Sequence, residues 1–299
     1  MKPFGVLCPI VTPCNRAGEI DFDGLVSVTQ YMLDHGCAGI FVAGSTGRGP
    51  WFSLDTKIKI CRRVRDQVGE KVPVFAGCAG SGLVDMLENA KAMKDAGSDV
   101  IVLTAPGYFN YSQSEIESIF LQFADQSQLP VLMYDIPVFA GIKLSTDVVS
   151  RLANHENIIG LKDSSADYDR FLEIISLLKD HSDFHLFQGK ENLLGQSIER
   201  GASGLVVSLL HINPKPYVDL YKAASSGDQT RANELQTTIV GMMDIVVKSF
   251  ERRPEISTLF HLFNVILKQR GICENIVLEH EGPCPDWIEI EAKKAMQIT

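Results

Sequence analysis

Residues 33–44 read LDHGCAGIFVAG, and the same layout recurs at 94–104 (KDAGSDVIVLT) and 198–208 (IERGASGLVVS). In each copy an amphipathic segment ends at a glycine, and an apolar run rich in β-branched residues begins shortly after it. Glycine suits the left-handed position just beyond a helix end, and a continuous apolar run is typical of a strand buried on both faces. Each stretch therefore predicts a helix, a tight loop and a buried parallel strand.

Further apolar runs fill the gaps between these copies, with helical patterns between them. Together they give eight expected strands, at about residues 6–11, 39–43, 73–77, 99–104, 130–135, 158–162, 184–188 and 204–208. Eight alternating strand and helix units, spaced about 25 to 35 residues apart, predict an α/β fold of the (β/α)8 or TIM barrel type. The alternative is a doubly wound open sheet, which usually carries a G-x-G-x-x-G fingerprint after its first strand. This chain has CPIVTPC there instead.

The pattern changes after the eighth expected strand, where no further strand is predicted. Residues 228–250, 254–270 and 285–297 show helical apolar periodicity and predict three helices. We therefore expect a barrel over residues 1–224 that carries the active site, and a C-terminal helical extension over residues 225–299 packed on it. The apolar faces of the extension must be buried on the barrel or in a partner subunit.

The composition excludes several classes of function. The 299 residues carry a formal net charge of -9 and no basic run, which argues against nucleic-acid or anionic-membrane partners. No stretch of about 18 apolar residues is present, so no membrane span is expected. The seven cysteines lack a C-x-x-C motif and the seven histidines lack a tight metal-ligand spacing. We expect a cytoplasmic protein with reduced thiols and no metal site.

In (β/α)8 barrels the active site lies at the carboxyl ends of the strands, so the residues after each expected strand are the candidates. GSTG at 44–47 offers the hydroxyls of Ser45 and Thr46 together with backbone N–H groups. This motif is either a cradle for a carboxylate or phosphate, or simply a tight turn. Tyr134 opens YDIP after the fifth strand. A tyrosine there can donate and accept a proton, or it can be an ordinary amphipathic residue of the rim.

Lys162 ends the sixth expected strand, in IIGLKDSS at 158–165. One interpretation is a strand-terminal lysine that reaches water, and the other is a nucleophile that forms a Schiff base with a carbonyl substrate. With a carboxylate cradle and a tyrosine on the same rim, the second interpretation describes an enzyme for 2-keto acids. The ketone condenses with Lys162, the iminium serves as the electron sink, and the tyrosine moves the proton.

Five motifs, in this order and spacing, carry a resemblance to a known family: GSTG, YDIP, GLKDSS at 160–165, FQG at 187–189 and GASGLVVSLLHINP at 201–214. Over residues 4–215 the chain resembles the dihydrodipicolinate synthase / N-acetylneuraminate lyase family of pyruvate-dependent class I aldolases. The resemblance implies that Lys162 forms the imine with pyruvate and that Tyr134 is the acid and base beside it. It also implies that Ser45 and Thr46 hold the carboxylate.

The same resemblance implies further site residues and partners. Tyr108 matches a tyrosine that often reaches a neighbouring subunit's site in a proton relay. Positions that line the distal pocket of sugar-acid lyases are matched by Ser164, Gly189, Glu191 and Ser208. Such enzymes are usually homotetramers, act on pyruvate and an aldehyde, and need no metal or diffusible cofactor.

Some positions depart from the family pattern. Arg48 stands where the family usually has a glutamate that supports the loop, which leaves the pairing inside this loop open. Phe139 stands where the synthases have an arginine for the second substrate's carboxylate, and an apolar ring cannot replace a guanidinium fork. Of two adjacent acids in the sialic acid lyases, this chain keeps Glu191. Its neighbour Lys190 either faces solvent, which we expect, or meets a second anionic group of the substrate.

Three functions follow as hypotheses. The main one is a lyase that cleaves a 2-keto-3-deoxy sugar acid or an N-acetylneuraminate-like substrate, because IPVFAGIKL resembles the sialic acid lyase version more closely. The second uses the same imine for a synthase-type condensation or for dehydration, and Phe139 argues against the synthase. The third is a non-catalytic barrel that binds keto acids, with Arg48 and Asp135 as signs of drift.

Overall fold

The structure, a computed structural model, describes residues 4–298. Its eight strands are β1 (Gly5–Pro9), β2 (Gly39–Val42), β3 (Val74–Gly77), β4 (Val100–Thr104), β5 (Val131–Asp135), β6 (Ile158–Asp163), β7 (His185–Gln188) and β8 (Gly204–Leu205). Each strand pairs in parallel with its sequence neighbours, and β1 pairs with β8, so that the sheet closes into a barrel. The predicted (β/α)8 barrel is confirmed.

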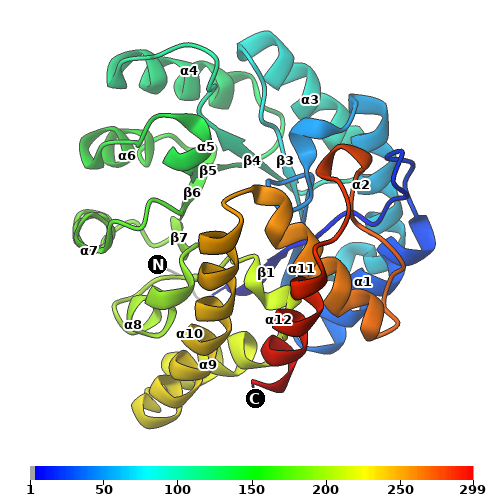
Figure 1. The fold of residues 1–299 in the computed structure, drawn as a ribbon. Coiled ribbons are helices and arrows are strands. Elements are labelled where there is room, and N and C mark those ends of the chain that lie inside the picture. The colour runs from blue at the N-terminus through cyan, green and yellow to red at the C-terminus, as the bar shows by residue number, and fades with distance from the viewer. Residues whose placement is uncertain (1–3, 299) are drawn as a thin grey trace.

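Helices surround this barrel and connect its strands (Figure 1). They are α1 (Phe22–Asp34), α2 (Leu54–Val68), α3 (Leu83–Asp95), α4 (Gln113–Gln126), α5 (Pro137–Ala140), α6 (Thr146–Leu152), α7 (Tyr168–Leu177) and α8 (Leu194–Glu199). The glycines predicted to end helices, Gly36, Gly97 and Gly201, have φ values of 92°, 96° and 107°. They turn the chain from a helix into the next strand, as the recurring layout predicts.

The last strand is shorter than predicted. The sequence predicts a strand over 204–208, but β8 ends at Leu205 and the chain then turns into a 3-10 helix, Leu209–His211. His211 is fully buried and fixes this turn: its Nε2 accepts from the Val11 N–H at 3.2 Å, and its Nδ1 donates to the Ser208 carbonyl at 2.8 Å. Because Nε2 must accept, the imidazole is neutral with its proton on Nδ1.

Strand side chains alternate between the barrel interior and the helix layer. The outward set packs against the helices in one continuous core. The interior set includes a cluster of large apolar residues and one tyrosine, among them Leu7, Phe41, Phe75, Val102, Leu132, Tyr134, Phe187 and Val206. Tyr134 thus belongs to the inward-facing set at the end of β5, which brings its ring into the mouth of the barrel.

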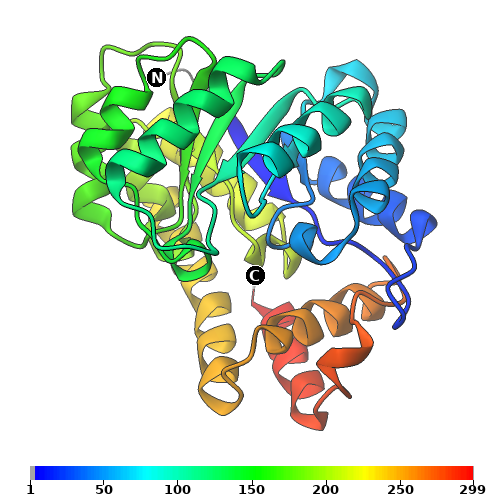
Figure 2. The same cartoon turned by 90° about the horizontal axis from the view of Figure 1, so that it is seen from above.

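Four helices complete the chain: α9 (Lys215–Ser226), α10 (Gln229–Arg252), α11 (Ile256–Gln269) and α12 (Asp286–Gln297). The last three lie close to the bounds predicted from sequence, and α10 packs against α9 and α12 while α11 packs against α12. The helices α11 and α12, orange to red, gather on one side of the barrel (Figure 2). Within residues 4–298, no helix combines the length and the apolar character needed to cross a bilayer. The division of the chain at residues 224 and 225 stays a prediction.

Candidate active site

A cavity of about 190 Å³ opens at the carboxyl ends of the strands. Eight of the nine site residues predicted from sequence line it: Ser45, Thr46, Tyr134, Lys162, Ser164, Gly189, Glu191 and Ser208. They lie at the ends of β5 and β6 or follow β2, β6, β7 and β8, so that five separate segments of the chain meet here. The fold therefore brings together residues that sequence analysis could only place at the ends of individual strands.

Lys162 and Tyr134 face each other because they are paired in register on neighbouring strands. Lys162 Nζ lies 3.9 Å from the centroid of the Tyr134 ring and 5.3 Å from that of Phe41. The two side chains are only 4% and 5% exposed. A nearly buried amine beside a phenol hydroxyl is suited to nucleophilic attack on a carbonyl with proton transfer nearby.

Several polar groups in the cavity have no hydrogen-bond partner inside the protein. Across the described residues, this holds for the hydroxyls of Ser45, Thr46 and Tyr134, and for the amine of Lys162. The backbone N–H groups of Ser45 and Thr46 are likewise unpaired within residues 4–298. Polar groups that are largely shielded from water normally find partners, so their convergence on one cavity indicates a site for a polar ligand.

The GSTG loop is held in place by very close backbone contacts. Ala43 begins it in the left-handed region, with φ 53°. A side chain at Gly49 or Gly77 would place its Cβ 1.8 Å or 2.2 Å from the Ala43 carbonyl oxygen, so glycine is required at both positions. Thr12 Oγ1 donates to the Gly47 carbonyl at 2.8 Å. The hydroxyls of the cradle are therefore presented by a rigid turn.

Arg48, which departs from the family pattern, forms a buried link to the C-terminal segment. Its Nη2 donates to both carboxylate oxygens of Glu281, at 2.9 and 2.7 Å, and its Nη1 donates to the Ile276 carbonyl. The guanidinium lies 3.7 Å from the ring centroid of Phe260, which lines the cavity. The pairing that the sequence left open is thus made with a residue from the far end of the chain.

The distal wall of the cavity carries the pair Lys190 and Glu191. Burial raises the pKa of the Glu191 carboxyl, while hydrogen bonds from its own N–H and from Leu209, together with nearby Lys190, act in the opposite direction. The segment is held by Gln236 of α10, whose Nε2 donates to the Glu191 carbonyl at 2.8 Å. Lys190, which we expected to face solvent, is among the residues that line the cavity.

Sequence analysis missed part of the cavity wall. Helix α11 contributes Ile256, Leu259 and Phe260, and the segment after β5 adds Ile136 and, from α5, Val138. The spacing of the α11 residues shows an apolar helix face, which predicts burial but not where the face is buried. Only the tertiary structure shows that this face closes the active-site cavity.

Tyr108 does not line the cavity of its own chain. It lies between β4 and α4, is 78% exposed, and contacts Phe109 edge-to-face with 4.9 Å between ring centroids. Among residues 4–298, no group of three or more histidine, cysteine, aspartate or glutamate side chains is arranged to hold a metal ion.

Comparison with known proteins identifies the family. Residues 2–272 match the model of the Dihydrodipicolinate synthetase family. The chain belongs to this family. It is a pyruvate-dependent class I aldolase of the dihydrodipicolinate synthetase family, whose members use a Schiff-base lysine. The family predicted from the motifs is thereby confirmed.

The relatives of the chain in this family include synthases. A 4-hydroxy-tetrahydrodipicolinate synthase of Kineococcus radiotolerans is 30% identical over 80% of this chain and 77% of its own length. A 4-hydroxy-tetrahydrodipicolinate synthase of Corynebacterium aurimucosum is 32% identical over 76% of this chain and 74% of its own length. These relatives do not single out the sugar-acid lyase branch that the sequence favoured.

Solved structures of the family share the whole fold. A dihydrodipicolinate synthase from Bacillus anthracis superposes with a TM-score of 0.89 at 27% identity, over 100% of this chain and 99% of its own. A prophage protein of the same family from E. coli K12, in complex with pyruvate, gives a TM-score of 0.89 at 25% identity. The match covers 98% of this chain and 97% of that protein. The family fold therefore extends through the C-terminal helices.

Proposed function

We propose that this enzyme condenses pyruvate with an aldehyde through an imine on Lys162. The observation that carries the proposal is the convergence of unpaired polar groups around a nearly buried amine. The Ser45 and Thr46 hydroxyls and N–H groups suit a carboxylate, and Lys162 is the amine in the same cavity. The named synthase relatives support the condensing direction.

The proposed reaction needs only the two substrates, water, and the side chains of Lys162 and Tyr134. The neutral Lys162 amine adds to the keto carbon of pyruvate, and loss of water gives the imine. Removal of a proton from the pyruvate methyl carbon gives an enamine, which forms the new carbon–carbon bond at the aldehyde carbon. The aldehyde oxygen takes up a proton, and water then hydrolyses the imine and frees the amine. Tyr134, against Lys162, is the acid and base of these transfers.

The aldehyde is the open part of the proposal. Phe139 lines the cavity and cannot grip a carboxylate as an arginine would, which argues against an aspartate semialdehyde-type partner. Ser164, Glu191 and Ser208 offer hydrogen bonds to a hydroxylated chain, which supports cleavage of a 2-keto-3-deoxy sugar acid as the second candidate. Both candidates use the same imine.

We further propose that the enzyme is a homotetramer in which Tyr108 reaches a neighbouring subunit's cavity. We also propose that it needs no diffusible cofactor, because the imine with Lys162 itself supplies the electron sink. The high exposure of Tyr108 in the single chain supports its role in an assembly.

Borohydride trapping tests the imine directly. The protein is incubated with pyruvate, reduced and digested, and the peptides are weighed. We expect the reduced adduct on Lys162 and none on Lys57, a second buried lysine outside the cavity that donates to Asn89. An adduct on another lysine, or none, would overturn the assignment. Product formation from pyruvate with aspartate semialdehyde, and pyruvate release from sugar acids, then identify the aldehyde.

A further inference from the structure

Two buried carboxylates lie directly behind the reactive pair. Asp135 follows Tyr134 at the end of β5, Asp163 follows Lys162 at the end of β6, and the two aspartates are paired in register. Since side chains alternate along a strand, the aspartates point into the helix layer while Tyr134 and Lys162 point into the barrel. Each aspartate is only 1% exposed.

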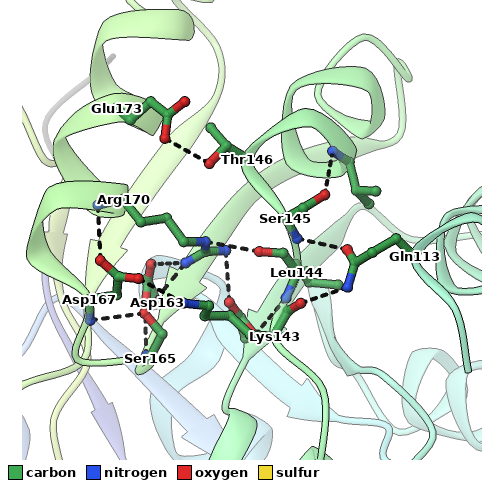
Figure 3. Close-up of polar contacts among 12 residues, drawn as sticks. Gln113, Lys143, Leu144, Ser145, Thr146, Asp163, Ser165, Asp167, Arg170 and Glu173 are labelled. Atoms are coloured by element: carbon green, nitrogen blue, oxygen red, sulfur yellow. Dashed lines mark hydrogen bonds and ion pairs between the residues drawn. The ribbon is translucent and has the colours of Figure 1, made fainter. Parts of the chain in front are cut away.

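One guanidinium joins both carboxylates. Arg170, in the first turn of α7, contacts Asp163 Oδ2 through Nη1 at 2.6 Å and Asp135 Oδ2 through Nη2 at 2.8 Å. Its Nε donates to the Leu144 carbonyl at 2.9 Å, and the Leu144 N–H donates to Asp135 Oδ1 at 3.3 Å. Figure 3 shows Arg170 between Asp163 and the Leu144 backbone, with Ser165 beside it.

The charges around this group do not balance locally. Two carboxylates share Arg170, and the next cation, Lys143, is paired with Asp167 at 2.7 Å. Burial raises the pKa of Asp135 to about 7; Arg170, the Leu144 N–H and Lys143 oppose the rise, and Asp163 adds to it. Near neutral pH the Asp135 carboxyl therefore exchanges a proton with solvent, and the repulsion between Asp135 and Asp163 changes with pH.

We propose that Arg170 is a positioning residue for the reaction of Lys162: by holding Asp135 and Asp163 together, it sets the separation between Lys162 and Tyr134. This inference rests on the proposed function. The geometry supports it because each aspartate is the chain neighbour of one reactive residue, so a change in the distance between the carboxylates is passed on through the strand ends. Among residues 4–298, the Arg170 side chain makes its hydrogen bonds and ion pairs with Asp135, Leu144, Asp163 and Ser165, and none of these four lines the cavity.

The alternative is that Arg170 only stabilises the fold, and this alternative makes different predictions. If Arg170 positions the reactive pair, its loss slows imine formation even where the protein is fully folded. A lysine cannot bridge two carboxylates as a fork does, so Arg170→Lys should recover only part of the rate. If Arg170 is only structural, its variants lose stability while the folded protein reacts at the normal rate.

The experiment follows the rate of borohydride-trapped pyruvate adduct at saturating pyruvate, from pH 6 to pH 8. The variants are Arg170→Met, Arg170→Lys and Asp135→Asn, compared with the wild type. Arg151→Met and Asp147→Asn are the matched controls, because both residues are exposed on α6 outside the cavity. Chemical denaturation at each pH confirms that only folded protein is compared.

We expect Arg170→Met to form the adduct about 10- to 100-fold more slowly than the wild type, as misplacement of reacting groups does, with Arg170→Lys in between. Asp135→Asn keeps the Arg170 contact to Asp163 and should fold even where Arg170→Met does not. Its rate relative to the wild type should change about threefold or more between pH 6 and pH 8, around the titration of Asp135. For the control variants, the rate of adduct formation relative to the wild type should stay constant between pH 6 and pH 8.

Two results would overturn the inference. Arg170 has no positioning role if its folded variants form the adduct at the wild-type rate and if the rate of Asp135→Asn relative to the wild type does not change with pH. If the wild type itself forms no pyruvate adduct on Lys162, the proposed function fails and the inference fails with it. Adduct formation on Lys162 in the wild type therefore shows whether the positioning role alone has failed or the proposed function as well.

Discussion

Tyr134 and Lys162 are the proposed reactive pair of the cavity, and their contact depends on a single register pairing between β5 and β6. The two residues have different roles in the proposed reaction. Lys162 makes the covalent bond, whereas Tyr134 moves protons, so the two roles separate experimentally.

Removal of the Tyr134 hydroxyl tests its role. We expect Tyr134→Phe to lower kcat by about 10²- to 10⁴-fold, the usual contribution of a general acid or base, while borohydride still traps the pyruvate adduct on Lys162. Steady-state turnover and peptide mass measure the two effects. Tyr168→Phe, outside the cavity, should leave kcat unchanged. A Tyr134→Phe variant with wild-type kcat would exclude tyrosine as the proton carrier.

His211 predicts a pH dependence of stability. Burial lowers its pKa from 6.5 to about 4, partly offset by its bond to the Ser208 carbonyl. In the unfolded chain the histidine takes up a proton below pH 6.5, whereas in the fold it stays neutral down to about pH 4. The unfolded state therefore binds more protons in this window, and stability falls as the pH falls, by roughly 3 kcal/mol in total.

Denaturant unfolding at pH 7, 6 and 5 measures this dependence. Asp135 acts in the opposite direction, because its raised pKa makes stability fall as the pH rises from about 4 to 7. The contribution of Asp135 cancels when the wild type is compared with His211→Gln, since Asp135 is present in both proteins. We expect the stability difference between wild type and His211→Gln to shrink as the pH falls. A difference that is constant across these three pH values would contradict a neutral buried His211.

At the scale of elements, the β2–α2 loop and the segment after α11 behave as one unit. Arg48 joins them through Glu281 and stacks on Phe260 of α11. The loop that presents Ser45 and Thr46 is thus held against a wall of the same cavity. A position that the sequence marked as a departure has a buried partner of opposite charge.

We expect Arg48→Met to lower the free energy of unfolding by about 3–5 kcal/mol, because it leaves Glu281 buried without a counter-charge. Arg151→Met removes an exposed pair with Glu117 and should cost at most about 1 kcal/mol. The KM for pyruvate should rise in Arg48→Met, since the cradle loses its support. Equal stabilities for the two variants, measured by denaturant unfolding, would show that the Arg48 link carries little energy.

At the scale of the whole molecule, the mouth of the barrel exposes several large apolar side chains. They follow β2, β4 and β5 or begin α11, and they are Trp51, Tyr108, Phe109, Val138, Phe139 and Ile256. Exposed apolar groups concentrated at one end of a molecule favour contact with another protein surface. This distribution supports the proposed tetramer.

Sedimentation tests the assembly. We expect a particle of four times the chain mass of 33.0 kDa. Tyr108→Asp should shift it toward smaller species and lower turnover, because a charge would be buried in the contact. Leu177→Asp is the control, since Leu177 is also exposed but ends α7, at the end of the barrel opposite to the mouth. If Tyr108→Asp assembles and turns over like the wild type, Tyr108 has no part in a shared site.

The sequence by itself determined the barrel, because apolar strands and helix-ending glycines are local signals that each segment carries. It also marked Lys162, Tyr134, Ser45 and Thr46, since an active site at strand ends can be found once the strands are known. It overestimated the last strand, whose end is set by His211 and its bond to the Val11 N–H, a contact across 200 residues.

Only the tertiary structure decided the parts of the site that depend on distant segments. The pairing of Arg48 with Glu281, the closure of the cavity by α11 and the sharing of Arg170 by two aspartates join residues that have no common pattern along the chain. Strand and helix periodicity follow from local backbone geometry, whereas these contacts follow from how the finished barrel and its C-terminal helices pack. For that reason the sequence could show each charge but not its partner.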